Sequence, residues 1–261
     1  MNILVCLKMV SRATYTDMLC SDDASDDRLS GGAIEINPAD AYALETALKL
    51  KDRYGAYVTV LSMSPMLAEP MLRSALAMGA DEAVLVCDRI FAGSDTIATA
   101  KTLSAALKAL PRQDMIFCGS KAIDSETGHI GAQLAALNEL RYMGDVLAVN
   151  ELRDGRLCVK HAEKHGAEEY SLVLPAVFSI INGTGMIRSP TIFGLRSSAK
   201  REIRIMTGDT LHLTAEQAGK NASGTETVRI DRLSFAHRHG AYTDDVHDGA
   251  AGLAEMLECA K

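Results

Sequence analysis

A polar loop between two apolar segments has the residue types best suited to ligand binding. The stretch FCGSKAIDSETGHIGAQLAAL, residues 117–137, ends one apolar run, passes through the polar run DSET at 124–127, and closes in an amphipathic pattern. A strand, a Gly and polar residues ahead of a helix commonly present backbone amides to a phosphate in α/β proteins. We therefore expect phosphate contacts from amides at 127–131 and hydroxyl contacts from Ser125 or Thr127. A plain helix-capping loop fits the spacing equally well.

A second polar segment, SDTIAT at 94–99, follows another apolar run. Loops that follow neighbouring parallel strands open at the same edge of a sheet, where ligands of α/β proteins bind. The two segments are therefore expected to converge on one ligand. Taken alone, this second segment favours a simpler role, in which Ser94 or Asp95 caps the following helix.

Other groups of reactive residues lack the spacing that catalysis or metal binding requires. His237, His239 and His247 lie among several Asp residues but have no helical i, i+4 spacing, so we expect a solvated segment at 237–248 and no metal site. The SGG at 30–32 does not directly follow the first apolar run, as the pyrophosphate loop of ATP-cleaving synthetases would. No GxSxG or Cys nucleophile motif is present. The sequence predicts a binding site without catalytic residues of its own and leaves enzymatic activity open.

Composition restricts the partners and the compartment. The 261 residues carry a formal charge of -7, which argues against a nucleic-acid-binding face. No stretch approaches the roughly 20 apolar residues of a membrane span, and Lys8 interrupts the apolar N-terminus, so we expect neither membrane insertion nor a signal peptide. Six dispersed cysteines without a CxxC pair predict buried free thiols in the cytoplasm.

Apolar runs that alternate with helical patterns predict an α/β core. The expected strands are 3–7, 57–62, 83–87 and 115–118, and the expected helices include one that begins at Asn37-Pro38 with Asn37 as its cap, one over 67–78 and one with a buried stripe at 97, 100, 103, 106, 107 and 110. Residues 145–181 predict a hairpin around Asp154-Gly155, and EYSLVLPAVFSII predicts one further strand. The sequence ends in a predicted helix.

The ordered set of motifs in the sequence resembles one family, the small (beta) subunit of electron transfer flavoproteins. The resemblance covers roughly residues 1–205 and rests on ordered segments: ILVCLKMV (3–10), INPADAYALETALKLKD (36–52), VTVLSMSP (58–65), ALAMGADEAVLV (75–86), AGSDTIATAKTLSAALK (92–108), DMIFCGSKAIDSETGHIGAQLA (114–135) and LPAVFSI (174–180). It implies a Rossmann-like parallel sheet of the adenine-nucleotide-binding, alpha-hydrolase-like type. It also implies a core at 1–201 and a C-terminal arm at 202–261 that packs on a partner subunit.

The resemblance further implies a heterodimer with a larger alpha subunit that holds FAD, while the beta chain binds AMP or a second FAD. Members with a second FAD take hydride from NADH and bifurcate electrons. The nucleotide contacts that carry over are Cys6, Asn37, Asp40, Met63, Asp95, Thr96, Thr99, Gly119, Ala122, Asp124, Ser125, Thr127, Gly128, His129 and Ile130. Asp124, Thr127 and Ile130, together with SDTIAT, favour FAD, although His129 stands where the family usually has Gln.

The same resemblance places a docking loop for partner dehydrogenases at 185–201, with Ile192 as its apolar anchor. A different hypothesis remains open, namely a flavin-free regulatory module of the universal-stress-protein type that binds an adenine nucleotide as a homodimer. Such a module would share the fold but lack the LPAV strand, the docking loop and the arm.

Overall fold

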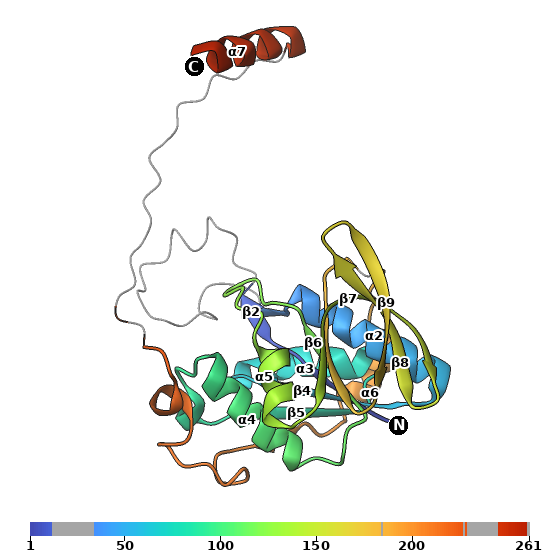
Figure 1. Cartoon of the computed structure of the whole chain (residues 1–261). Coiled ribbons are helices and arrows are strands. Elements are labelled where there is room, and N and C mark those ends of the chain that lie inside the picture. Colours follow the sequence, from blue (N-terminus) through green and yellow to red (C-terminus); the bar gives the residue numbers. More distant parts are fainter. Residues whose placement is uncertain (12–33, 184, 227, 229–244, 260–261) are drawn as a thin grey trace. The chain divides into compact units, whose positions relative to one another are not determined.

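A nine-stranded sheet forms the centre of the larger of two compact units, Met1–Val228 and Arg229–Lys261 (Figure 1). The computed structural model describes residues 1–11, 34–183, 185–226, 228 and 245–259. The strands are β1 (Asn2–Cys6), β2 (Met9–Ser11), β3 (Ile34–Ile36), β4 (Tyr57–Met63), β5 (Glu82–Val86), β6 (Met115–Gly119), β7 (Arg141–Arg153), β8 (Arg156–Glu163), β9 (Gly166–Val173), β10 (Ala176–Ile180) and β11 (Arg204–Met206). The helices are α2 (Pro38–Tyr54), α3 (Glu69–Met78), α4 (Thr96–Lys108), α5 (Ile130–Leu137), α6 (Ile192–Ser198) and α7 (Val246–Cys259), with short 3-10 helices η1 (Met66–Ala68), η2 (Arg89–Phe91) and η3 (Gly219–Ala222).

The order of strands in the sheet creates a switch point at its centre. The order is β11-β5-β4-β1-β6-β10-β7-β8-β9, parallel from β11 to β7 and antiparallel from β7 to β9. After β1, the next two strands of the sheet, β4 and β5, lie on one side of β1. The following strand, β6, pairs with the opposite edge of β1. Ligands of open α/β sheets bind at the carboxyl ends of the strands beside such a switch. The fold therefore directs attention to the loops after β1 and β6.

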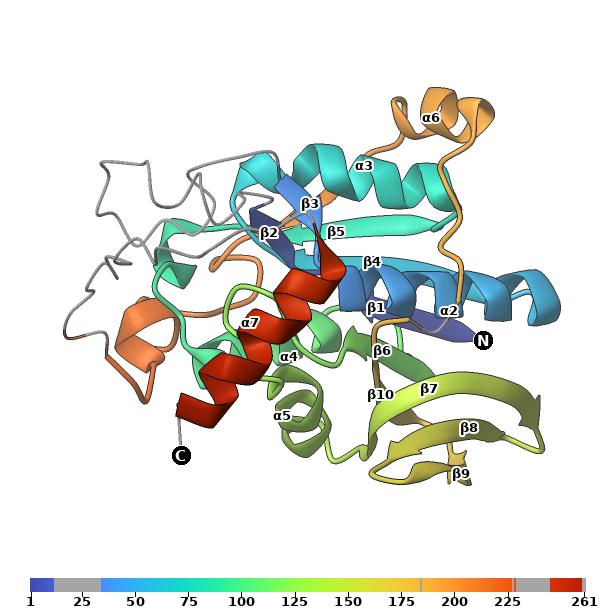
Figure 2. The ribbon, with the colours of Figure 1, turned by 90° about the horizontal axis from the view of Figure 1, so that it is seen from above.

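Both faces of the central strands are buried, which is why these strands are continuous apolar runs. Ile3 and Val5 face one apolar cluster, with residues of α2 and α3, whereas Leu4 and Cys6 face a second cluster with residues of α4 and α5. Figure 2 shows α2 and α3 on one side of the sheet and α4 and α5 on the other. Phe117 of β6 is fully buried and lies 5.5 Å from Phe178 of β10, measured between ring centroids.

Most of the predicted elements are confirmed to within a residue or two. The four predicted strands correspond to β1, β4, β5 and β6, the hairpin at Asp154-Gly155 joins β7 to β8, and α7 is the predicted terminal helix. Helix α2 begins at Pro38 and ends before Gly55, whose φ of 68° suits the left-handed cap that glycine favours. In α4 the predicted buried stripe is wrong at Ile97, which is 44% exposed in the first turn.

The single strand predicted for EYSLVLPAVFSII is wrong, because the segment forms two strands in different parts of the sheet. β9 pairs antiparallel with β8, and β10 pairs parallel with both β6 and β7. Pro175 separates them, and a proline has no backbone N–H with which to continue a strand ladder.

The larger compact unit includes residues beyond 201. β11 pairs parallel with β5 as an edge strand, and the compact unit continues to Val228. The first part of the predicted arm thus lies on the core of its own chain. The division of the chain at residue 201 stays a prediction.

Replacing Phe117 by Ala is expected to lower the free energy of unfolding by about 3–5 kcal/mol, because the cavity would lie at the centre of the sheet. The matched control is Tyr57→Ala, since Tyr57 is 47% exposed. Chemical denaturation of the purified protein measures both. Equal losses in the two variants would contradict this description of the core.

Candidate functional site

The buried carboxylate of Asp40 joins the two strands that flank the switch point. Its Oδ1 accepts a hydrogen bond from the Gly119 amide at 2.7 Å, and its Oδ2 accepts one from the Lys8 amide at 2.7 Å. Asp40 lies in the first turn of α2, where a negative charge also faces the positive end of the helix dipole. A Cβ at position 119 would collide with Oδ1 and lie 2.7 Å from the Cβ of Ala39. Only glycine therefore allows β6 to approach α2 this closely.

Burial dominates the ionisation of Asp40. Desolvation raises its pKa from 3.8 to about 6, and the two hydrogen bonds from Lys8 and Gly119 oppose that rise. The carboxylate is consequently charged at neutral pH but close to its titration range in mild acid. The neighbouring Cys118 thiol has a pKa raised well above its ordinary value, by a hydrogen bond with Cys6 and by burial.

The side chain of Asn37 holds the loop after β6 rather than the end of its own helix. Its Nδ2 donates to the Lys121 carbonyl at 3.0 Å, and its Oδ1 accepts from the Ile123 amide at 3.1 Å. Asn37 occupies the N-cap position of α2 as predicted, but the expected capping role of its side chain is wrong, because the side chain makes no capping bond there. An amide carries both a donor and an acceptor, so it can satisfy a carbonyl and an N–H of one loop at once.

Lys8 anchors the same loop from β1, and sequence reasoning missed it. Its Nζ lies 2.6 Å from Asp124 Oδ1 and 3.4 Å from Ser125 Oγ. The signal available in the sequence was its place, two residues after a buried strand and therefore at the carboxyl edge of the sheet. Asn37 and Asp40 at the start of α2, together with Lys8 after β1, hold the loop at 119–125.

The polar segment after β5 meets α5 but has an intramolecular role as well. Gln133 Nε2 of α5 donates to Thr96 Oγ1, in the first turn of α4, at 3.2 Å. The convergence of the two loops on one ligand stays a prediction. Asp95 caps α4 through the Ala98 amide at 2.9 Å, and its other oxygen accepts from the amides of Gly224 at 2.7 Å and Thr225 at 3.1 Å. Both oxygens of Asp95 are thus engaged by its own chain.

The remaining predicted site residues lie around this edge without a common hydrogen-bond network. Cys6, Met63 and Ile130 border one apolar cluster of the core. Gly128 has a φ of 66° and lines an open cleft of about 580 Å³. Thr127 and His129 are exposed, and Ala122 and Thr99 are half-buried. The cleft is lined by Ser120, Lys121, Glu126, Gly128, Tyr142, Asp145, Ser179, Ile181 and Asn182.

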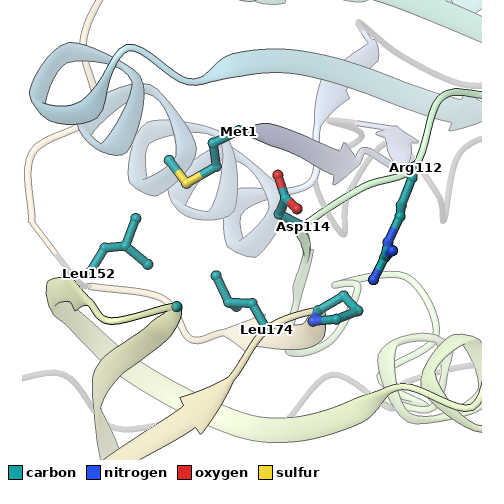
Figure 3. Close-up of a pocket in the computed structure, with 7 residues that line it drawn as sticks. Met1, Arg112, Asp114, Leu152 and Leu174 are labelled. Atoms are coloured by element: carbon teal, nitrogen blue, oxygen red, sulfur yellow. The ribbon is translucent and has the colours of Figure 1, made fainter.

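A second pocket, of about 330 Å³, lies at the opposite edge of the sheet and contains no predicted site residue. Figure 3 shows Met1, Arg112, Asp114, Leu152 and Leu174 around it. β1 begins at Asn2 and β6 at Met115, so this pocket is at the amino ends of the strands. That is the edge at which α/β folds do not usually place their ligands.

Neither a metal cluster nor a membrane span is found in the described part of the chain. Groups of three or more His, Cys, Asp or Glu that could hold a metal ion are missing there, and none of its helices is long and apolar enough to cross a membrane. The segment at 237–244, and the SGG at 30–32, lie outside the described residues. The cysteines at positions 6, 87, 118 and 158 are free thiols.

The fold and the site define the class of protein. A mostly parallel Rossmann-like sheet, with its polar loops gathered at the carboxyl ends of β1 and β6, is the architecture of α/β proteins that bind ligands at a switch point.

Comparison with known proteins then identifies the family. Residues 30–204 match the electron transfer flavoprotein domain. The chain is 36% identical over 259 residues to an electron transfer flavoprotein subunit beta of Thermoanaerobacterium thermosaccharolyticum, which covers 98% of both chains. It is 35% identical to subunit CarD of a caffeyl-CoA reductase-Etf complex of Acetobacterium woodii (88% of this chain, 87% of CarD). It is 43% identical to an acryloyl-CoA reductase electron transfer subunit gamma of Anaerotignum propionicum (61% and 64%). The chain belongs to the electron transfer flavoprotein beta subunit family and takes part in electron transfer.

The raised pKa of Asp40 predicts a pH dependence of stability. Unfolded Asp40 releases its proton near pH 3.8 and folded Asp40 near 6, so the folded state binds more protons between these values. The free energy of unfolding should therefore fall as the pH rises through this window, and Asp40 should contribute no further change above it.

Denaturation of the wild type and of Asp40→Asn at several pH values measures this contribution. The variant has no titrating group at position 40, so its stability should fall less between pH 4 and pH 6. Identical pH dependence in the two proteins would show that Asp40 does not titrate in this range.

Proposed function

We propose that this chain is the beta subunit of a heterodimeric electron transfer flavoprotein and binds an adenine nucleotide at the carboxyl ends of β1 and β6. The observation that carries the proposal is the loop after β6, which Asp40, Asn37 and Lys8 fasten to β1 and α2 ahead of the start of α5. A loop fastened in this way keeps backbone amides in place before a ligand arrives, which lowers the entropic cost of binding.

The start of α5 supports a phosphate contact. His129, at the N-cap position, makes no side-chain capping bond, so the first amides of the helix are free of a side-chain acceptor. Such amides and the helix dipole favour an anion. Gly128 adopts the left-handed conformation just before this turn, which turns the chain toward α5. We assign the phosphate to the amides at 127–131.

A buried acceptor without a hydrogen-bond partner supports the proposal that a nucleoside binds next to that phosphate. Gln133 Oε1 is buried and has no hydrogen-bond partner among the described residues. Native proteins rarely leave such an acceptor without a donor, and an amino or hydroxyl group of a nucleoside could supply one. Cys6 and Met63 would provide the apolar wall against which a flat base packs.

The choice between AMP and a second FAD favours FAD. Two relatives are named as parts of reductase systems, a caffeyl-CoA reductase-Etf complex and an acryloyl-CoA reductase. A bound flavin would supply the redox chemistry, and the residues of this chain would bind and orient it. With AMP in its place, the chain would hold a structural nucleotide only.

The partners follow from the same proposal. The larger alpha subunit would hold FAD, and the heterodimer would work in the cytoplasm. A dehydrogenase would dock on the segment around α6, where Met186 is 87%, Ile192 84% and Phe193 85% exposed. Exposed apolar side chains in one short segment are unusual on a soluble protein and mark contact sites. The comparison with known families leaves no reason to propose the universal-stress-protein alternative.

Replacing Thr127 by Trp is expected to lower the nucleotide content of the heterodimer at least about tenfold, because the larger side chain would occupy the place of the phosphate. Thr127 is exposed, so the fold should tolerate the change. The matched control is Thr214→Trp, at an exposed position outside the site. Nucleotides released by denaturation are quantified by chromatography. An unchanged content in Thr127→Trp would refute the assignment.

Replacing Ile192 by Ser is expected to raise the KM for a partner dehydrogenase at least about tenfold, since central apolar anchors dominate transient interfaces. The value of kcat should not change. Ile205→Ser is the control, because Ile205 is an exposed Ile that lies outside α6, on edge strand β11. Electron transfer between the heterodimer and a CoA-ester dehydrogenase is followed by flavin absorbance. Equal KM values for both variants would argue against docking at α6.

A further inference from the structure

Helix α6 is too short, and too poor in buried apolar contacts, to be stable on its own. It has seven residues, far below the roughly 12–15 residues at which isolated helices become even marginal. Its large apolar side chains point away from the core, with Ile192 84%, Phe193 85% and Leu195 52% exposed. The helix must therefore be held by contacts of its backbone. Figure 2 shows α6 beside α3, which packs on it.

Arg73 of α3 supplies the first of these contacts. Its Nη1 donates to the carbonyls of Ser198 at 2.9 Å and Arg201 at 3.1 Å, which lie at and just after the end of α6. The last carbonyls of a helix have no partner within it, so a guanidinium placed there satisfies them. Glu69, one turn earlier in α3, accepts from Arg73 Nε at 3.0 Å and Nη2 at 2.6 Å and fixes its orientation.

The start of α6 is held just as closely. Thr191 Oγ1 accepts from the Gly194 amide at 2.9 Å and caps the helix. A Cβ at position 194 would collide with the carbonyl oxygen of Ala77 in α3. Gly194 therefore permits backbone contact between the two helices, at a place where any side chain would push α6 outward.

Arg188 fastens the segment that leads into α6 to helix α2. Its backbone amide and Nε donate to Glu45 Oε2 at 3.1 and 2.9 Å, its Nη2 donates to Glu45 Oε1 at 3.1 Å, and the same Nη2 reaches Asp52 at 2.8 Å. Glu45 is only 5% exposed, so its carboxylate is shielded from water, whereas Asp52 lies at the surface. The hydrogen bonds with Glu45 raise the pKa of Arg188 and keep it charged.

We propose that Arg73 and Arg188 are positioning residues for partner docking, which hold α6 as a rigid, preformed platform for its exposed apolar side chains. The inference rests on the proposed docking function of α6. Neither arginine needs to touch the partner. Because α6 is already ordered in the free protein, binding of a partner does not include the entropic cost of ordering the helix. The binding affinity is correspondingly higher. The basic side chains Arg196 and Lys200 remain exposed beside the platform and favour a partner whose apolar pocket has an acidic rim.

Hydrogen exchange of the complete heterodimer tests the positioning role. Arg73→Gln should increase the exchange rates of the amides at 194–201 at least about tenfold, whereas the amides of β1 and β6 should exchange as in the wild type. Trypsin should also cleave Arg73→Gln faster after Arg196. Arg156→Gln is the matched control, because Arg156 lies on β8 and contacts Ser171. Unchanged exchange at 194–201 in Arg73→Gln would overturn the inference.

Kinetics separates this inference from the docking function itself. With a CoA-ester dehydrogenase that the wild-type heterodimer serves, Arg73→Gln should raise the KM about tenfold at constant kcat. Arg73→Lys keeps the charge but not the planar fork, and should give an intermediate KM. If Ile192→Ser raises the KM and Arg73→Gln does not, docking stands and the positioning role fails. If neither variant raises the KM, the docking function fails.

Discussion

The buried carboxylate of Asp40 is the interaction on which the arrangement of this edge of the sheet depends. By accepting the Lys8 amide just after β1 and the Gly119 amide at the end of β6, it links the two strands at which the chain changes direction. Because Asp40 lies in the first turn of α2, its carboxylate also connects the start of this helix to both strands. Desolvation makes a buried carboxylate costly, and two backbone donors together with a helix N-terminus offset much of that cost.

The loop after β6 takes its shape from the same region. Asn37 immediately precedes α2 and holds the loop through its amide, and Lys8, two residues after β1, holds it through Asp124. The proposed nucleotide site is therefore prepared by residues that are far apart in sequence but adjacent at the switch point. The segment around α6 is likewise held by residues that are distant in sequence. Arg73 and Arg188 lie outside α6, and together with Gly194 inside it they fix the position of the helix.

The spacing of apolar residues in the sequence predicted those helices and strands whose position depends mainly on burial of one face in the core. The central strands and α2 are apolar on the faces that the core covers, and Pro38 and Gly55 mark the ends of α2 by local backbone preference. The split between β9 and β10 was not predicted in this way, because the apolar end of β9 runs on through Leu174 toward the apolar β10 and the pairing partners of the two strands are set by the rest of the sheet.

Side chains that act at long range were hidden from sequence reasoning. Asn37 has the residue type and position of a helix cap, and nothing local shows that its amide serves the loop 84 residues further along the chain. Lys8 was readable as a polar residue at a strand end, but its partner Asp124 was not. Arg73 gave no signal, because an arginine on an exposed helix face usually points into solvent.

The most direct measurement is the nucleotide content of the heterodimer formed with the alpha subunit. The purified complex is denatured, and FAD and AMP are quantified per heterodimer by chromatography. The account predicts a second nucleotide beyond the FAD of the alpha subunit, with two FAD expected and one FAD plus one AMP the structural alternative. A complex that holds one FAD and no other nucleotide would contradict the account.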